Sequence, residues 1–378
     1  MPGGKRMLLP FPRIFRPFQQ TASQVAQKYN ISSALRLLIL IAVSFGNAPL
    51  QAQEVDPPFG DPEFISSDAR LEMVFNEGLA LTESPAEGPD GMIYFSDITF
   101  TTSAGADGIE AGHIWRFDPS TGETTIYRSP SGMSNGLKFD AQDRLIAAEG
   151  ADQGGRRVTR TDMETGKAYI IAHEYEGRSF NAPNDVAIDE QGRVYFSDPK
   201  YIGNESVEQP VMAVYRIDTD GSIHRIITDA GKPNGVVVSP DQQTLYVVSN
   251  DNGSIDLGKI TLDIPVHKGR MALLAYDLHE DGSATFRSVL VDYLPEDGPD
   301  GLVVDVEGNL YVSERDVTRP GIAIRAPDGT EKAFIPTGVL PTNVGFGRGE
   351  NSKILYITAG TGLYRIPVMK DGYHLPRE

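Results

Sequence analysis

The most constraining feature of this sequence is a phrase that recurs six times. Its fullest form covers residues 183–198, and a close copy covers residues 299–314. Each copy reads as a polar anchor, a short apolar strand, an Asp/Gly turn and a second apolar strand. The sequence between copies supplies two further strands, so each repeat predicts a four-stranded unit. The anchors of the six copies are Glu87, Asn135, Asn184, Asn234, Asp300 and Asn343.

The spacing of these units predicts a closed ring. Successive anchors lie 43–50 residues apart, except for one gap of 66 residues before Asp300. A four-stranded unit at that period is typical of a propeller blade, so we expect an all-β fold, a six-bladed β-propeller over residues 71–370. Residues 71–75 should supply the last strand of the sixth blade, and the longer gap predicts an inserted loop around residues 251–271. A pair of β-sandwiches, the rival all-β fold, would not produce so regular a period.

The first 53 residues differ from the rest of the chain. They contain six basic residues and no acidic ones, with an apolar run at residues 37–43 and small residues near Ala52. This is the pattern of a secretory signal peptide with a long basic leader. We therefore expect residues 1–53 to be removed, residues 54–70 to be a linker, and the mature protein to be periplasmic or secreted. An uncleaved membrane anchor is the alternative.

Charge and composition limit the classes of partner that this protein can bind. The chain has 34 basic and 52 acidic residues, and removing the six basic residues of the leader leaves a net charge of −24. So acidic a surface argues against nucleic acid or an anionic membrane as partner. Cysteine is absent, which excludes disulfides, thiolate metal sites and cysteine nucleophiles. We expect a small-molecule substrate, no membrane contact after signal cleavage, and a monomer or small homo-oligomer.

The anchors predict a metal site on the axis of the ring. The innermost strand of each blade lines the central channel of a propeller, so residues at the starts of these strands face one another. Asp, Glu and Asn offer oxygen atoms to a hard cation, and mixed carboxylate and amide ligands favour calcium over zinc or copper. A simple Asn–Gly turn is the alternative for any one Asn. That alternative explains neither Glu87 nor Asp300.

Further polar residues near the anchors are candidate substrate contacts. Glu149 lies fourteen residues beyond Asn135, at the far end of a second strand that turns back toward the same face. Asp185 directly follows Asn184. For Glu149 and Asp185 the alternative is a structural role, in capping a hairpin or binding the amides of the next loop. The six histidines show no zinc spacing, and no nucleophile elbow is present.

Several phrases together resemble the gluconolactonase family, which includes senescence marker protein and luciferin-regenerating enzyme. The resemblance spans residues 71–367, and it implies one catalytic divalent metal held by Glu87, Asn184, Asn234 and Asp300. Among relatives, the residue at Asn184 either binds the metal or contacts the substrate or a metal-bound water. The phrases that carry the resemblance are residues 87–89, 180–186, 195–199, 233–236 and 299–302, with residues 156–160 similar to the bacterial branch. One departure is Ala148-Glu149-Gly150, where that branch has Cys-Glu-His-Gly.

The resemblance also implies an activity. We expect an enzyme, a hydrolase of carboxylic ester bonds that opens a sugar lactone such as glucono-δ-lactone to the aldonic acid. Calcium is the expected metal, with Zn²⁺, Mg²⁺ and Mn²⁺ as alternatives. Asp300 is the candidate catalytic base that orients or deprotonates water, and a purely ligating role for it stays open. Substrate contacts are expected from Asn135, Asn184, Glu149 and Asp185. A propeller esterase or phosphotriesterase and a non-catalytic binding propeller are the competing hypotheses.

Overall fold

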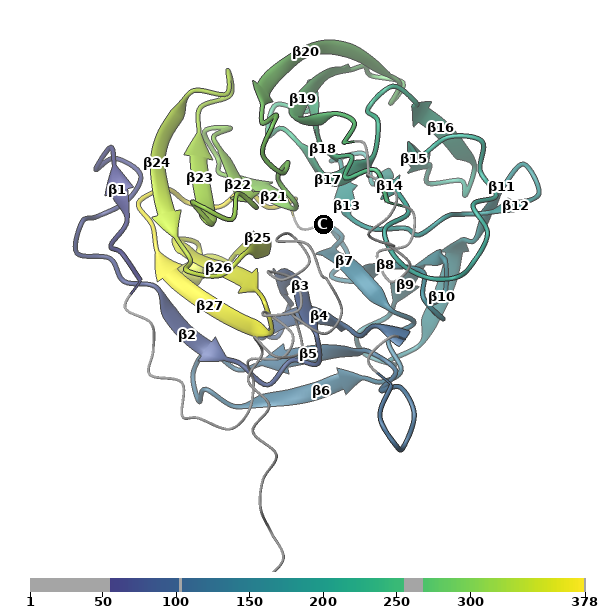
Figure 1. Ribbon diagram of the computed structural model, residues 1–378, viewed down its shortest axis with the longest axis horizontal. Helices are drawn as coiled ribbons and strands as arrows, with labels where there is room; N and C mark the ends of the chain where they lie inside the picture. The colour runs from purple at the N-terminus through teal and green to yellow at the C-terminus, as the bar shows by residue number, and fades with distance from the viewer. Residues whose placement is uncertain (1–54, 102–103, 255–267, 377–378) are drawn as a thin grey trace, which may run out of the picture. The chain divides into compact units, whose positions relative to one another are not determined.

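The computed structural model describes residues 55–101, 104–254 and 268–376. Within these residues, six sheets of four or five strands surround a common centre (Figure 1). This arrangement confirms the predicted six-bladed β-propeller. The predicted signal peptide and most of the predicted inserted loop lie outside the described residues, so an exported location stays a prediction. No helix in the described part of the chain is long and apolar enough to cross a membrane.

Four antiparallel strands build each blade from the centre outward. The innermost strands are β3 (Leu81–Glu87), β7 (Ser134–Phe139), β13 (Val186–Ile188), β17 (Pro233–Val238), β21 (Leu302–Val304) and β25 (Pro341–Phe346). The second strands are β4 (Ile93–Ile98), β8 (Leu145–Glu149), β14 (Val194–Asp198), β18 (Thr244–Asn250), β22 (Leu310–Glu314) and β26 (Ile354–Ala359). The third strands are β5 (His113–Phe117), β9 (Arg157–Thr161), β15 (Ala213–Ile217), β19 (Met271–Leu278), β23 (Gly321–Arg325) and β27 (Gly362–Pro367). The outer strands are β6 (Thr124–Arg128), β10 (Ala168–Ala172), β16 (Ile223–Ile227), β20 (Ala284–Asp292), β24 (Glu331–Pro336) and β2 (Glu72–Phe75).

The sixth blade closes the ring with strands from both ends of the propeller. Strand β2 pairs with β27, with Met73 opposite Tyr364 and Phe75 opposite Leu363. The prediction that residues 71–75 complete this blade is thereby confirmed. Closure gives every blade a neighbour on both sides, so that each blade packs against the next around the ring.

The Asp/Gly turns explain why the copies resemble one another. In the third blade, Asp189 Oδ1 accepts hydrogen bonds from the backbone N–H groups of Gln191 at 3.0 Å and Arg193 at 2.9 Å. Gly192 completes the turn with a φ of 79°, a conformation that glycine adopts at little cost. Asp305 caps the corresponding turn of the fifth blade in the same way. The repeat therefore encodes one hairpin between the first and second strands of each blade.

Apolar side chains between adjacent blades form the core. Tyr195 and Val214 of the third blade, for example, pack in one cluster with Val236 and Leu245 of the fourth. The second strands β4, β8, β14, β18 and β22 are buried along their whole length. Burying one such Val or Leu side chain stabilises the fold by roughly 1.5–3 kcal/mol. These contacts fix the blades, and hence the positions of the inner strands.

Residues 54–70 were predicted to be a linker, but part of this segment packs against the ring. The two residues of β1 (Phe59–Gly60) pair with β24 and give the fifth blade an extra strand. Phe64 and Ile65 are only 6% and 2% exposed and belong to the core between the fifth and sixth blades. The linker prediction is corrected for these residues, because their apolar side chains are buried rather than solvated.

A C-terminal strap, residues 371–375, crosses one end of the inner strands. Gly372 donates its N–H to Ser352 O at 2.9 Å, and the N–H of Tyr373 donates to Val304 O at 3.1 Å. The Tyr373 hydroxyl reaches the third blade, where it donates to Glu190 Oε1 at 2.8 Å. The strap thus connects the sixth, fifth and third blades. Two further short strands, β11 (Glu174–Tyr175) and β12 (Arg178–Ser179), form a separate hairpin.

Candidate functional site

Two cavities lie at opposite ends of the inner strands. The site cavity, about 150 Å³, is lined by residues at the starts of these strands, including Asn135 and Asn234. The strap cavity, about 80 Å³, is lined by the ends of all six inner strands and by the C-terminal strap. The site cavity contains three of the four predicted metal ligands, namely Asn184, Asn234 and Asp300.

Glycines beside the anchors let neighbouring blades approach closely. The N–H of Gly136 donates to Asn184 O at 2.6 Å, and the N–H of Gly235 donates to Asp300 O at 3.1 Å. A Cβ on Gly235 would lie 2.5 Å from Asp300 O, a contact that no other residue could make without displacement. The Asn–Gly pairs therefore do not form hairpin turns. They hold the backbone of one anchor against the next blade.

Asp300 is a buried carboxylate held by an arginine. It is 8% exposed, and Arg315 Nη1 lies 3.1 Å from its Oδ2. The same guanidinium donates to Pro341 O at 2.9 Å, which fixes its position. Burial raises the pKa of Asp300 to about 6, although the charge of Arg315 opposes the shift. A carboxyl with such a pKa can exchange a proton near neutral pH.

Glu83 is a second buried carboxylate in the site cavity. It is 3% exposed, and its Oε2 atom has no hydrogen-bond partner within the described part of the chain. Burial, followed by the negative charge of Asp300, raises the pKa of Glu83 well above its usual range. A buried carboxylate oxygen without a partner is costly. A cation in this cavity would remove that cost.

Amide side chains complete the polar lining. Asn135 and Asn184 are half-buried, and their side chains form no hydrogen bond with any residue that the structure describes. Asn234 is 6% exposed, and its Nδ2 donates to the Tyr201 hydroxyl at 3.3 Å. That hydroxyl in turn donates to Asn250 O at 3.1 Å. The amides of Asn135 and Asn184 are therefore available to a ligand, whereas that of Asn234 has a fixed orientation.

The sequence predicted Glu87 as a metal ligand, but the structure does not place it in the site cavity. Glu87 lies at the other end of β3, next to the hairpin turn, and lines the strap cavity. Its Oε2 accepts the backbone N–H of Arg348 at 2.8 Å. Glu83, four residues earlier on the same strand, occupies the position predicted for Glu87. We therefore replace Glu87 by Glu83 in the donor set.

Two of the predicted substrate contacts do not line the site cavity. Glu149 is 3% exposed, and its carboxylate accepts hydrogen bonds from Arg157 at 2.7 Å and Thr159 at 3.0 Å. Asp185 is 1% exposed and accepts the backbone N–H of Val236 at 3.1 Å. Both carboxylates are committed to holding strands together, which is the structural alternative raised for them above. Asp185 still acts on the site through its charge, which raises the pKa of Asp300.

The sequence reasoning missed Glu83, Arg315 and Tyr201, although a signal for Glu83 was present. Asn135 precedes Glu149 by fourteen residues, and Asp300 precedes Glu314 by the same interval. Counting fourteen residues back from Asp97, the equivalent end of the second strand β4, gives Glu83 rather than Glu87. Arg315 directly follows the copy at residues 299–314, and Tyr201 lies two residues beyond the phrase at residues 195–199, but no spacing marks either residue.

The donor set fits an oxygen-preferring divalent cation. Two carboxylates, Glu83 and Asp300, and the amides of Asn184 and Asn234 face one cavity. No group of three or more His, Asp or Glu side chains suited to an ion occurs among residues 55–101, 104–254 and 268–376. The set therefore depends on amide oxygens, which calcium accepts readily and zinc rarely uses.

Comparisons with known proteins agree with this fold. The SMP-30/Gluconolactonase/LRE-like region matches residues 81–361 of the chain. A gluconolactonase of Zymomonas mobilis subsp. mobilis is 30% identical over 250 residues, which cover 64% of each protein. The lactonohydrolase oryL of Aspergillus oryzae is 26% identical over 266 residues, 66% of this chain and 60% of that protein. The chain thus spans somewhat under two thirds of the length of these two relatives.

Solved structures of other proteins also resemble this chain in fold. The gluconolactonase XC5397 of Xanthomonas campestris superposes with a TM-score of 0.64 at 25% identity, covering 84% of this chain and 99% of that one. The calcium-binding protein regucalcin of Agrobacterium tumefaciens has a TM-score of 0.60 at 17% identity, covering 82% and 97%, and shows a shared fold. The match over residues 81–361 covers most of the chain, so this protein belongs to the SMP-30/gluconolactonase/LRE-like family.

Proposed function

We propose that this protein is a calcium-dependent lactonase that hydrolyses a sugar lactone, such as glucono-δ-lactone, to the aldonic acid. One observation carries the metal part of the proposal. Glu83 Oε2 is buried without a hydrogen-bond partner in the described residues, in a cavity that also contains the carboxylate of Asp300. Two buried carboxylates repel each other, and Arg315 is the cation that offsets Asp300. A divalent ion would balance both charges. Family membership and the names of the relatives support the lactonase part.

The lining of the site cavity suits a small polyhydroxylated ring. The amides of Asn135 and Asn184 can both donate to and accept from hydroxyl groups. An apolar wall completes the cavity and can pack against the face of a sugar ring; its side chains are those of Leu81, Ile98, Phe100, Met133 and Ile202. A few polar groups set in an apolar wall are typical of sites for small molecules. We therefore assign the lactone to this cavity.

The proposed roles follow from burial and pKa. Glu83, Asn234 and Asp300 would bind the ion, and the more exposed Asn184 would contact the substrate beside it. A bound divalent cation supplies Lewis-acid polarisation of a carbonyl. Asp300, whose pKa is raised to about 6, is suited to accept a proton from the attacking water. Arg315, which lines the same cavity, would stabilise negative charge that develops on the lactone oxygen.

Hydrolysis of glucono-δ-lactone by the purified protein tests this proposal. Acid release is followed with a pH indicator in three samples: untreated protein, protein with chelator, and chelated protein with added calcium. We expect turnover above the spontaneous rate, its loss with chelator and its recovery with calcium. The absence of turnover in every sample would contradict the lactonase activity. Turnover that survives the chelator would contradict the metal requirement alone.

A further inference from the structure

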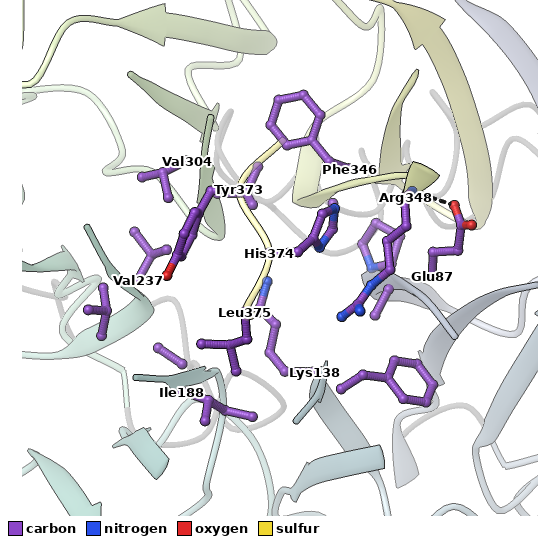
Figure 2. Close-up of a pocket in the computed structure, with 17 residues that line it drawn as sticks. Glu87, Lys138, Ile188, Val237, Val304, Phe346, Arg348, Tyr373, His374 and Leu375 are labelled. Carbon is purple, nitrogen blue, oxygen red and sulfur yellow. Dashed lines mark hydrogen bonds between the residues drawn. The ribbon is translucent and has the colours of Figure 1, made fainter. Parts of the chain in front are cut away.

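The strap cavity has a charge pattern that the proposed lactonase activity does not use. Figure 2 shows Lys138 and Arg348 extending into the same space, bordered by the strap residues Tyr373, His374 and Leu375. The remaining wall is largely aliphatic, with contributions from Ala187, Ile188, Val237, Val238, Val303 and Val304. Two cationic side chains therefore share one cavity with largely apolar walls, where electrostatic attraction is stronger than in bulk water.

Lys138 is half-buried, and it differs from the two buried lysines of the described chain, Lys200 and Lys232. Lys200 lies 2.9 Å from Glu205 Oε2, and Lys232 donates to Asn252 Oδ1 at 2.7 Å. Lys138 forms neither a hydrogen bond nor an ion pair within the described residues. Burial lowers the pKa of its ammonium group, and the charge of Asp185 opposes the shift. An ammonium group that is partly desolvated and unpaired lacks the anion that would normally accompany it.

Arg348 adds positive charge to the same space. Its guanidinium lies 4.0 Å from Asp143 Oδ1, and its charge lowers the pKa of Lys138. Glu87, the acidic residue of the cavity lining, accepts the backbone N–H of Arg348 at 2.8 Å.

Hydrogen bonds from the C-terminal strap to the blades hold the strap cavity in an ordered form. Gln242 Nε2 donates to the Tyr373 hydroxyl at 3.0 Å, and this hydroxyl donates to Glu190 at 2.8 Å. His374 Nε2 lies 2.8 Å from Gly347 O. Strap residues are therefore tied to the third, fourth and sixth blades. A site that is already ordered loses little conformational entropy when it binds a ligand.

From these observations we propose that the strap cavity binds a small oxyanion between Lys138 and Arg348. The ligand class is a phosphate or a small carboxylate, since both present negative oxygens to an ammonium and a guanidinium group. A cavity of about 80 Å³ has room for such an ion. The site is separate from the site cavity and stands whether or not the lactonase proposal does.

Calorimetric titration with inorganic phosphate, and separately with acetate, tests the proposal. The protein is treated with chelator so that no metal ion can hold the anion in the site cavity, and chloride keeps the ionic strength constant. We expect saturable binding of one phosphate. Lys138→Met should weaken it about tenfold or more, because a charged hydrogen bond is lost. Lys167→Met, the same change at an exposed lysine of the outer hairpin, is the matched control and should bind as the wild type does.

The Lys138→Met variant should fold, because Lys138 is half-buried and its removal breaks no ion pair within the described residues. Arg348→Gln is the second variant, since it keeps the backbone N–H that Glu87 accepts, and it should also weaken phosphate binding. Acetate binding with the same dependence on Lys138 would extend the site to carboxylates. Absence of both phosphate and acetate binding to the wild type would overturn the proposal. So would binding that Lys138→Met leaves unchanged.

Discussion

The two cavities use the same six inner strands and have opposite charge. In the site cavity, Glu83 and Asp300 face one arginine. In the strap cavity, Lys138 and Arg348 extend into the same space, and Glu87 accepts the backbone N–H of Arg348. Glu83 and Glu87 are the same residue type on the same strand, four residues or about 13 Å apart. The comparison shows that depth along the inner strand, rather than residue type, decides which cavity a side chain serves.

Asp300→Asn should produce the largest effect, and it tests whether catalysis takes place in the site cavity. The change keeps the shape of the side chain but removes its charge and its ability to accept a proton. We expect kcat for glucono-δ-lactone to fall by about 10²–10⁴-fold, with the circular dichroism spectrum unchanged. A kcat equal to that of the wild type would remove Asp300 from the reaction.

Asn184→Ala should separate substrate binding from ion binding within the site cavity. Asn184 is half-buried with an amide that no described residue binds, whereas Asn234 is 6% exposed and fixed by Tyr201. We expect Asn184→Ala to raise KM about tenfold, as for loss of a substrate hydrogen bond, while calcium affinity stays near that of the wild type. A rise in KM accompanied by an equal loss of calcium affinity would instead identify Asn184 as a metal ligand.

Tyr201→Phe should weaken calcium binding indirectly. The Tyr201 hydroxyl accepts from Asn234 Nδ2, so it fixes the orientation of this amide. Loss of one such hydrogen bond costs about 1 kcal/mol, which corresponds to an affinity about fivefold lower. Tyr373→Phe, the same change on the strap side, serves as control and should leave calcium affinity unchanged. An equal response of the two variants would contradict the separation of the two cavities.

Calcium affinity should depend on pH, with a sign set by the carboxylates of the site cavity. Burial raises the pKa of Asp300 to about 6 and that of Glu83 well above its usual range. A protonated carboxyl cannot bind calcium, so affinity must fall as the pH falls through these values. Between pH 7.5 and 5.5, Asp300 alone should lower the affinity about fourfold. Calcium titrations at several pH values and constant ionic strength measure this dependence. A calcium affinity that rises on acidification would contradict the assignment of Glu83 and Asp300 as ligands.

The fold could be read from the sequence because the repeat encodes a local hairpin, with Asp189 and its equivalents capping each turn. The site could be read only where a copy was complete, as at Asn234 and Asp300. In the first blade, the inner strand reads Leu81-Thr-Glu-Ser-Pro-Ala-Glu87 and lacks the usual run of aliphatic residues. The anchor of the first blade was therefore predicted at Glu87, the wrong end of this strand, instead of at Glu83. Arg315 acts through a contact between blades that no local pattern records.

The most direct measurement of the central claim compares calcium binding by wild type, Glu83→Gln and Glu87→Gln in calorimetric titrations at pH 7.5. The two variants carry an identical change at opposite ends of one strand. We predict that Glu83→Gln weakens calcium binding by about tenfold or more, because a charged ligand becomes neutral, whereas Glu87→Gln binds calcium as the wild type does. A loss confined to Glu87→Gln, or an unchanged affinity in Glu83→Gln, would contradict the assignment of the ion to the site cavity.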